Sequence, residues 1–169
     1  MRFTIEQQFD HDVAAVLATL TDPAFIGQMA DLPKLGRPEL LVREQRGTQL
    51  TVHVRYAFVG ELSGAVRRVV DPARLTWIEE SNVDLTSHTA SFRIVPDHYT
   101  SLLQCAGSSE LVPAGAGSAR VTEADLRVSV PLVGGRVERA IVSGLREHAA
   151  AEAELVDSWL TAHGPPAGT

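Results

Sequence analysis

Residues 130–160 of the chain read VPLVGGRVERAIVSGLREHAAAEAELVDSWL, and this stretch decides the fold. An extended segment ends near Pro131, two glycines provide a turn, and a helical pattern then continues to His163, where Gly164 can end it. The helix is roughly 40 Å long at about 1.5 Å per residue. No other predicted helix matches that length, so it is expected to pack on a sheet. Its apolar stripe consists of Val137, Ile141, Leu145, Leu155, Trp159 and Leu160.

The middle of the chain shows the alternation that is typical of such a sheet. From Glu39 onward the hydrophobic period changes to two, most clearly over residues 50–58, where Leu50, Val52 and Val54 alternate with Thr51 and His53. The turns between successive segments are short, which implies antiparallel pairing. About seven strands are predicted, at residues 3–9, 50–58, 65–70, 75–80, 86–95, 99–106 and 118–130.

Two short helices are predicted directly after the first strand. Asp10 or Asp12 can cap a helix over residues 13–20. Asp22 suits the N-cap and Pro23 the first position of a second helix, which carries an apolar face from residue 25 to residue 32.

The composition indicates one soluble domain. A chain of 169 residues can bury a sizeable core, and we expect a single domain over residues 1–163 with a frayed tail at 164–169. No apolar run is long enough to span a bilayer and the N-terminus lacks the pattern of a secretory signal, so no stable membrane insertion is expected. The single cysteine, Cys105, agrees with a reducing compartment, and we expect a cytoplasmic location.

The charge and the motifs exclude several classes of function. With 21 acidic against 15 basic residues the net charge is −6, so the positive surface that binds a phosphate backbone is missing and no nucleic-acid partner is expected. The six histidines show no metal-ligand spacing and one cysteine cannot build a structural zinc site, so no metal is predicted. No nucleotide-binding glycine pattern and no Gly-x-Ser-x-Gly elbow occurs, so neither a cofactor nor an activated serine is predicted.

Three segments in this order resemble the START-like (SRPBCC) superfamily, which includes polyketide cyclases, lipid-transfer domains and birch-pollen-type allergens. They are the opening DHDVAAVLATLTDPAF at 10–25, the helix entry VPLVGGRVERAI at 130–141 and the tail EAELVDSWL at 152–160. The resemblance covers the whole chain and is closest to a bacterial branch of undefined function.

The resemblance implies an α+β helix-grip fold, in which a strongly bent antiparallel sheet wraps the long C-terminal helix. Side chains between the two either fill the space or leave a cavity for an apolar ligand. The superfamily keeps no common catalytic motif, so no active-site residue is carried over from it, because a shared fold is not shared chemistry.

Aromatic residues on the predicted strands are candidates for the wall of such a cavity, and filling of the core is their alternative role. Tyr56 and Trp77 lead because each carries a polar tip that requires a partner when buried. The further candidates are Phe58, Phe92 and Tyr99.

His148 and Glu152 interrupt the apolar stripe of the last helix, four residues apart. They could bind and orient a ligand, or act as an acid and base with shifted pKa values. Alternatively, both reach solvent at the helix edge as an i,i+4 pair, or they form a buried structural hydrogen bond. Gly144, one turn earlier, either marks a close approach of another segment or is simply tolerated.

The sequence therefore leads to three hypotheses of function. The first is the binding of a small hydrophobic molecule, such as a lipid, a polyketide-like or an aromatic metabolite, between the sheet and the last helix. The second is an enzyme of the cyclase, dehydratase or hydrolase type that uses the same cavity. The third is an interaction or co-chaperone-like module with a filled core and an apolar surface patch. Neither catalysis nor the oligomeric state follows from the sequence.

Overall fold

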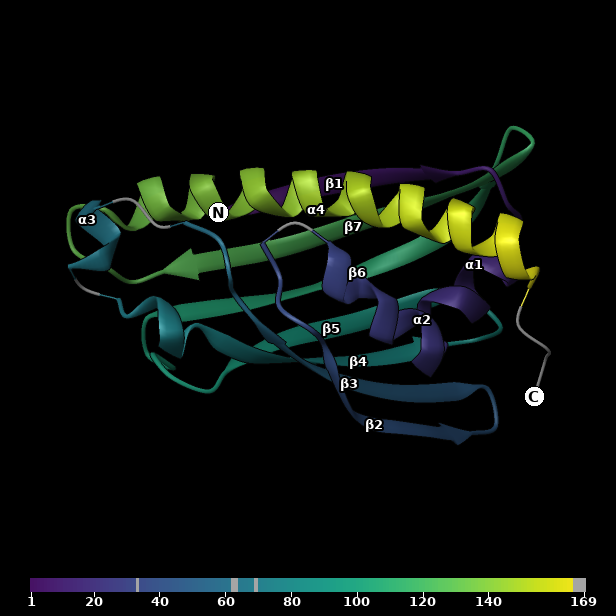
Figure 1. The fold of residues 1–169 in the computed structure, drawn as a ribbon, viewed down its shortest axis with the longest axis horizontal. Helices are drawn as coiled ribbons and strands as arrows, with labels where there is room; N and C mark the ends of the chain where they lie inside the picture. Colours follow the sequence, from purple (N-terminus) through teal and green to yellow (C-terminus); the bar gives the residue numbers. More distant parts are fainter. Residues whose placement is uncertain (33, 62–63, 69, 166–169) are drawn as a thin grey trace.

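The computed structural model describes residues 1–32, 34–61, 64–68 and 70–165. Seven strands form one antiparallel sheet in the order β1-β7-β6-β5-β4-β3-β2 (Figure 1). The strands are β1 (Arg2–Phe9), β2 (Glu39–Arg46), β3 (Gln49–Ala57), β4 (Thr76–Asp84), β5 (Thr89–Pro96), β6 (Leu103–Ala114) and β7 (Gly117–Val128). The helices are α1 (Val13–Leu20), α2 (Pro23–Gln28), α3 (Gly64–Arg67) and α4 (Gly134–His163), with 3₁₀ turns η1 (Met29–Asp31) and η2 (Pro72–Arg74).

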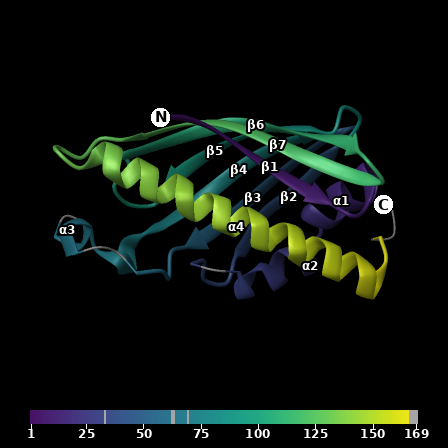
Figure 2. The same ribbon diagram turned by 90° about the horizontal axis from the view of Figure 1, so that it is seen from above.

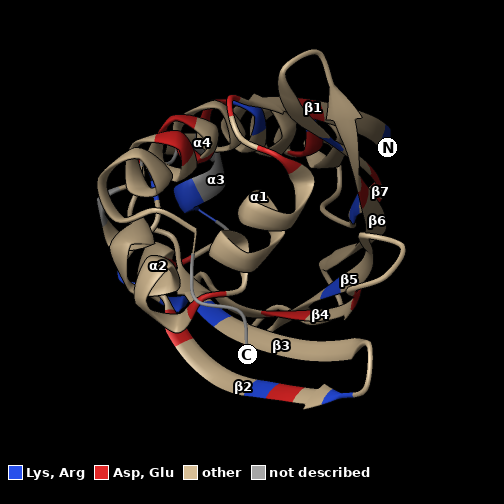
Figure 3. Ribbon diagram, turned by 90° about the vertical axis from the view of Figure 1, so that its right-hand side faces the viewer, with Lys and Arg blue, Asp and Glu red and all other residues tan. Residues whose placement is uncertain are grey.

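The sheet is strongly bent and α4 lies on its concave side. Figure 2 shows α4 running across the sheet, and the end-on view in Figure 3 shows the strands curving round from β1 to β2, with α1 inside the bend. The predicted helix-grip architecture is confirmed, including the number of strands and the two short helices after the first strand. No helix in the described ranges is long and apolar enough to cross a membrane.

The ends of the helices follow from local chemistry. The Asp12 carboxylate accepts a hydrogen bond from the Ala15 amide at 2.9 Å, and Asp22 caps α2 in the same way with Pro23 at its first position. At the other end of the chain, Gly164 takes a left-handed φ of 70° and closes α4 after His163, as predicted. Of the predicted frayed tail, residues 166–169 lie outside the described residues.

The main core fills the end of the hollow that α1 and α2 occupy. Phe25 of α2 meets Trp159 of α4 edge to face, with ring centroids 5.8 Å apart. Around this contact, Val16, Leu50 and Val156 are fully buried. The side chains at this end therefore pack as a solid interior.

Two predicted strands differ from the structure. The strand expected at 65–70 is wrong: Gly64–Arg67 is the helical turn α3, and position 69 lies outside the described residues. This segment does not pair with β3, the strand before it in the chain, because β2 and β4 already occupy the two sides of β3. The seventh strand is instead β2, which a turn at Gly47 (φ 62°) joins to β3.

The strand expected to begin at Tyr99 begins later. Tyr99 takes a left-handed φ of 59° in a turn, where the Leu102 amide donates to its carbonyl at 2.8 Å, and β6 starts at Leu103. Further along β6, Gly107 lies very close to β7. A Cβ there would come within 2.7 Å of the Ala124 Cβ, so only glycine allows this approach.

Candidate functional site

The helices leave the middle of the concave face uncovered. Within the described part of the chain, α4 packs mainly on β1 and β7, α1 on β6 and β7, and α2 on β2. The inward-facing residues of the outer strands are accordingly buried, as with Val52 and Val54 of β3 and Ala124 and Leu126 of β7. On the central strands, Val83 of β4 and Leu111 of β6 join the main core, whereas most of the other inward-facing residues are only partly buried.

We call this uncovered region the inner patch. Strand pairing places its members on adjacent strands, because residues that alternate along each strand share one face. Its walls are mostly apolar, with a few polar groups between them. The members are Tyr56, Trp77, Glu79, Ser81, Phe92, Ile94, Leu103 and Cys105.

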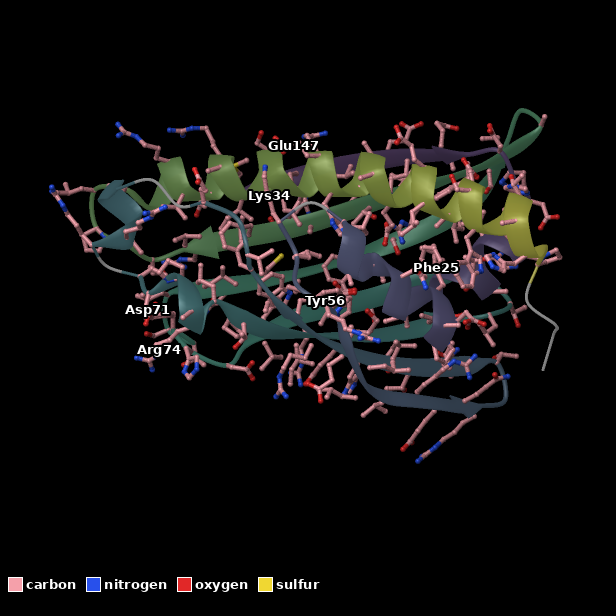
Figure 4. The ribbon with its side chains drawn as sticks, viewed as in Figure 1. Phe25, Lys34, Tyr56, Asp71, Arg74 and Glu147 are labelled. Atoms are coloured by element: carbon pink, nitrogen blue, oxygen red, sulfur yellow. The ribbon has the colours of Figure 1, made fainter. Side chains whose placement is uncertain are left out.

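An aromatic pair forms one end of the inner patch. Tyr56 of β3 is directly opposite Trp77 of β4, and the two rings are stacked with centroids 6.0 Å apart and an interplanar angle of 27°. Figure 4 shows Tyr56 in the middle of the molecule. Burial, reinforced by the negative charges of Glu79 and Glu152, raises the pKa of Tyr56 well above its ordinary value, so its hydroxyl remains a neutral donor.

Glu79 is the one acidic member of the inner patch. It lies between Val54 of β3 and Ile94 of β5, and its carboxylate accepts a hydrogen bond from the Ser81 hydroxyl at 3.2 Å. Burial raises the pKa of Glu79, and the negative charge of Glu152 adds to the increase, while Ser81 and Arg120 oppose it. A carboxyl group in these surroundings is strongly affected by any charge that enters the hollow.

Glu152 belongs to a closed polar network between α4 and the sheet. It forms an ion pair with Arg120 of β7, and its Oε2 accepts a hydrogen bond from Gln7 Nε2 at 3.0 Å. Gln7 also donates to the Ala149 carbonyl at 2.7 Å and accepts from Arg120 Nε at 2.7 Å. Burial alone would raise the pKa of Glu152, but the Arg120 charge and these hydrogen bonds outweigh it and lower that pKa.

His148 lies one turn before Glu152 on α4. In the structure as described, its Nδ1 is buried and makes no hydrogen bond, to Glu152 or to any other group. Burial lowers the pKa of His148, against the opposing effect of Glu152, so the imidazole is neutral near pH 7. The two residues do not form a hydrogen-bonded pair: Glu152 is held by Arg120 and Gln7, and His148 keeps an unused ring nitrogen.

The remaining predicted residues separate into two groups. Phe92 belongs to the inner patch and packs beside the core cluster that contains Ala124 and Leu126. Phe58 lies just beyond β3, where it bridges to Leu35. Tyr99 lies in the β5–β6 turn, and its hydroxyl accepts a hydrogen bond from the Asp71 amide at 3.1 Å, so it does not join Tyr56 and Trp77.

Gly144 is approached by a side chain rather than by the sheet. Lys34, in the loop before β2, reaches α4 and forms an ion pair with Glu147 (Figure 4). A Cβ on Gly144 would lie 4.0 Å from the Lys34 side chain, which is ordinary contact, so the position does not require glycine.

A pocket of about 830 Å³ opens beside the inner patch. The pairing of β5 with β6 stops at Ile94 and Cys105, while the pairing of β6 with β7 continues to Leu103. The two strands therefore diverge, and Ile94, Leu103 and Cys105 line the pocket together with outward-facing residues such as Arg93 and Gln104. Its volume falls in the range of small-molecule sites, roughly 300–1,000 Å³.

Sequence reasoning missed Glu79, Ser81 and Arg120. The signal for the first two was present: Trp77 was expected to face inward, and the period of two then directs positions 79 and 81 to the same face.

Cys105 is in a strand as expected, and burial raises its pKa to about 11, so it is not a thiolate nucleophile. No group of potential metal ligands occurs in the described ranges.

Solved structures with this arrangement differ widely from the chain in sequence. TTHA0849 from Thermus thermophilus superimposes with a TM-score of 0.69 at 14% identity, over 96% of this chain and 98% of that one. The Zhui aromatase/cyclase from Streptomyces sp. R1128 gives a TM-score of 0.63 at 13% identity, over 97% and 98%. Norcoclaurine synthase from Thalictrum flavum gives 0.62 at 14% identity, over 96% and 87%.

These likenesses show the helix-grip fold. No curated protein matches the chain in sequence at a significant level. A family model does match, from residue 4 to residue 160, under the description "Protein of unknown function (DUF2505)". The chain therefore belongs to the DUF2505 family.

Proposed function

We propose that the protein binds a small, largely apolar molecule against the inner patch, on the concave side of the sheet beside α4. One observation carries the proposal: most inward-facing side chains of the central strands stay partly exposed, whereas those around α1 and α2 are packed solid. A concave, mostly apolar surface with a few polar groups is the usual form of a ligand site. The stacked Tyr56–Trp77 pair supplies one wall and Phe92 another.

The polar groups of the hollow support binding with a defined orientation. The Tyr56 hydroxyl, the Glu79 carboxyl and His148 Nδ1 are few and spaced among apolar side chains, as expected for groups that orient a bound molecule. Glu152 would then affect ligand binding only indirectly, because its carboxylate holds Arg120 and Gln7 in place. The 830 Å³ pocket at the β5–β6 gap gives a path toward Leu103 and Cys105.

Binding is favoured over the two other hypotheses. The enzyme hypothesis relied on His148 and Glu152 as an acid and a base, and Glu152 has its carboxylate engaged by Arg120. Two proteins of the same fold are named as an aromatase/cyclase and as norcoclaurine synthase, so catalysis on this scaffold stays the alternative. An interaction module is less well supported, because the exposed large apolar side chains among the described residues come from four separate segments: Met1, Leu41, Val59 and Leu132.

The test uses Nile red, a neutral apolar dye whose fluorescence rises in an apolar site. Ser81→Trp fills the inner patch and is expected to weaken dye binding at least about tenfold, since it removes the space that the dye occupies. Ser91→Trp adds the same side chain on the outer face of β5, where Ser91 is exposed, and should leave binding unchanged. Ser81→Leu is the milder variant if the tryptophan unfolds the protein, as judged by circular dichroism.

Native mass spectrometry of the purified protein complements the dye. A co-purified small molecule that Ser81→Trp excludes and Ser91→Trp retains is the expected result. Absence of both a bound molecule and dye uptake in the wild type contradicts the proposal, as does equal dye binding by the two tryptophan variants.

A further inference from the structure

Glu79 lies on the inner patch, and no described residue forms an ion pair with it. Its neighbours across the strands are Val54 and Ile94, and along β4 they are Trp77 and Ser81. The hydrogen bond from Ser81 is the one contact to its carboxylate that the described residues make. Strand pairing places Glu79 on the same face of the sheet as Tyr56 and Trp77.

Arg120 is the cation whose charge acts on Glu79, and its side chain is already bound to other residues. Arg120 directs Nη2 to Glu152 and Nε to Gln7, and this network is closed by the bond from Gln7 to Glu152. The charges of Arg120 and Glu152 largely cancel for a group that lies outside the pair. Glu79 therefore lies on the inner patch without a positively charged partner of its own.

The groups around this carboxyl suit a cation. The stacked Tyr56 and Trp77 rings lie on the same face, directly beside Glu79 along and across the strands. Aromatic faces attract an ammonium group, and a buried carboxylate binds one by a charge-assisted hydrogen bond. An anionic ligand would instead be repelled by Glu79.

We propose that the inner patch selects a ligand that carries a protonated amine on an aromatic or apolar body, with Glu79 as its counter-ion. This inference rests on the proposed function, because it names the chemical class that the same site takes. The apolar body lies against Phe92 and Ile94, and the ammonium group lies between Glu79 and the Tyr56–Trp77 pair.

Three probes of nearly equal size test the charge preference: 1-naphthylmethylamine, 1-naphthalenemethanol and 1-naphthoate, each titrated against Nile red at pH 7. The wild type is expected to bind the amine about tenfold more tightly than the alcohol, and the carboxylate most weakly. Glu79→Gln keeps the shape of the side chain and removes its charge, so the amine and the alcohol should then bind equally. Glu80→Gln is the matched control, because Glu80 pairs with Arg93 on the outer face.

The outcomes separate this inference from the proposed function. Equal or tighter binding of the alcohol by the wild type overturns the amine preference while ligand binding stands. A preference for the amine that survives in Glu79→Gln also overturns it, since another group would then be the counter-ion. Failure of all three probes and of Nile red to bind the wild type contradicts the proposed function itself.

Discussion

Removal of either Arg120 or Glu152 alone is expected to lower the stability of the fold strongly. Replacement of both residues by apolar side chains is expected to change it much less. Its side chains are only 20% and 10% exposed. Arg120→Met removes the ion pair and the 2.7 Å bond to Gln7, and leaves the Glu152 carboxylate buried with one hydrogen bond from Gln7. Loss of one partner of a buried pair costs about 3–5 kcal/mol, a large part of the roughly 5–15 kcal/mol that stabilises a domain.

Urea unfolding, followed by circular dichroism and tryptophan fluorescence, measures this cost. The double variant Arg120→Met, Glu152→Met is expected within about 2 kcal/mol of the wild type, because two apolar side chains replace two charges that had to be desolvated. Arg127→Met, an exposed position on the same strand, is the control and should change stability by less than about 0.5 kcal/mol. A cost below about 1 kcal/mol for Arg120→Met, or a double variant as unstable as the sum of the singles, refutes the reasoning.

The same pair predicts a dependence on pH. Because the folded-state pKa of Glu152 is lowered, its contribution in the wild type is present above the unfolded pKa, about 4.3, and is lost as the pH falls through the folded value. In Arg120→Met the carboxyl is buried without its cation, so its folded pKa should rise and protonation should favour the fold. The gap in stability between the two proteins is therefore expected to narrow from pH 7 to pH 5.

Four further substitutions and one labelling experiment have defined outcomes. Gly107→Ala should lower the free energy of unfolding by several kcal/mol in urea titrations, because its Cβ would overlap β7; Gly27→Ala, with open space around its Cβ, should be neutral or stabilising by up to about 1 kcal/mol. Asp22→Ala should cost about 1 kcal/mol in the same assay by removing the cap of α2. The native Cys105 thiol should react with iodoacetamide at pH 8 roughly 100-fold more slowly than in urea, since its pKa is raised to about 11. Lys34→Ala removes an exposed ion pair with Glu147 and should change stability by less than about 1 kcal/mol in the same urea assay.

The elements that could be predicted are those whose signal is local. The α4 stripe, the Asp22–Pro23 start of α2 and the Gly164 end of α4 each depend on residues within one or two turns. The error at 65–70 has a different origin, because a short apolar segment becomes a strand only if a neighbouring edge is free, and that depends on pairing far along the chain. The start of β6 was predicted too early, at Tyr99, for a related reason. In a short polar stretch, the sequence of a turn resembles that of a strand end.

The candidate site could be predicted in part. Tyr56 and Trp77 were chosen as wall candidates for their polar tips, and strand pairing brings them to one face of the sheet. The period of two, applied from Trp77 to the next position on that face, would have found Glu79. Arg120 could not have been found, because it meets Glu152 only through the packing of α4 on β7, 32 residues away in sequence. Without Arg120, the sequence could not show that Glu152 is structurally engaged and that His148 lacks a partner.

The uncovered inner patch follows from the small residues of α4. Ala149 and Ala153 are buried against the sheet and adjoining core, and small side chains at a helix contact let the helix axis approach its neighbour closely. The alanines thus draw α4 toward β1 and β7, at one side of the bend, while α2 covers β2 at the other side. The strands between them lose their cover, and Glu79 lies on one of them. Ala149 and Ala153 of α4 therefore also determine which part of the concave face stays partly exposed.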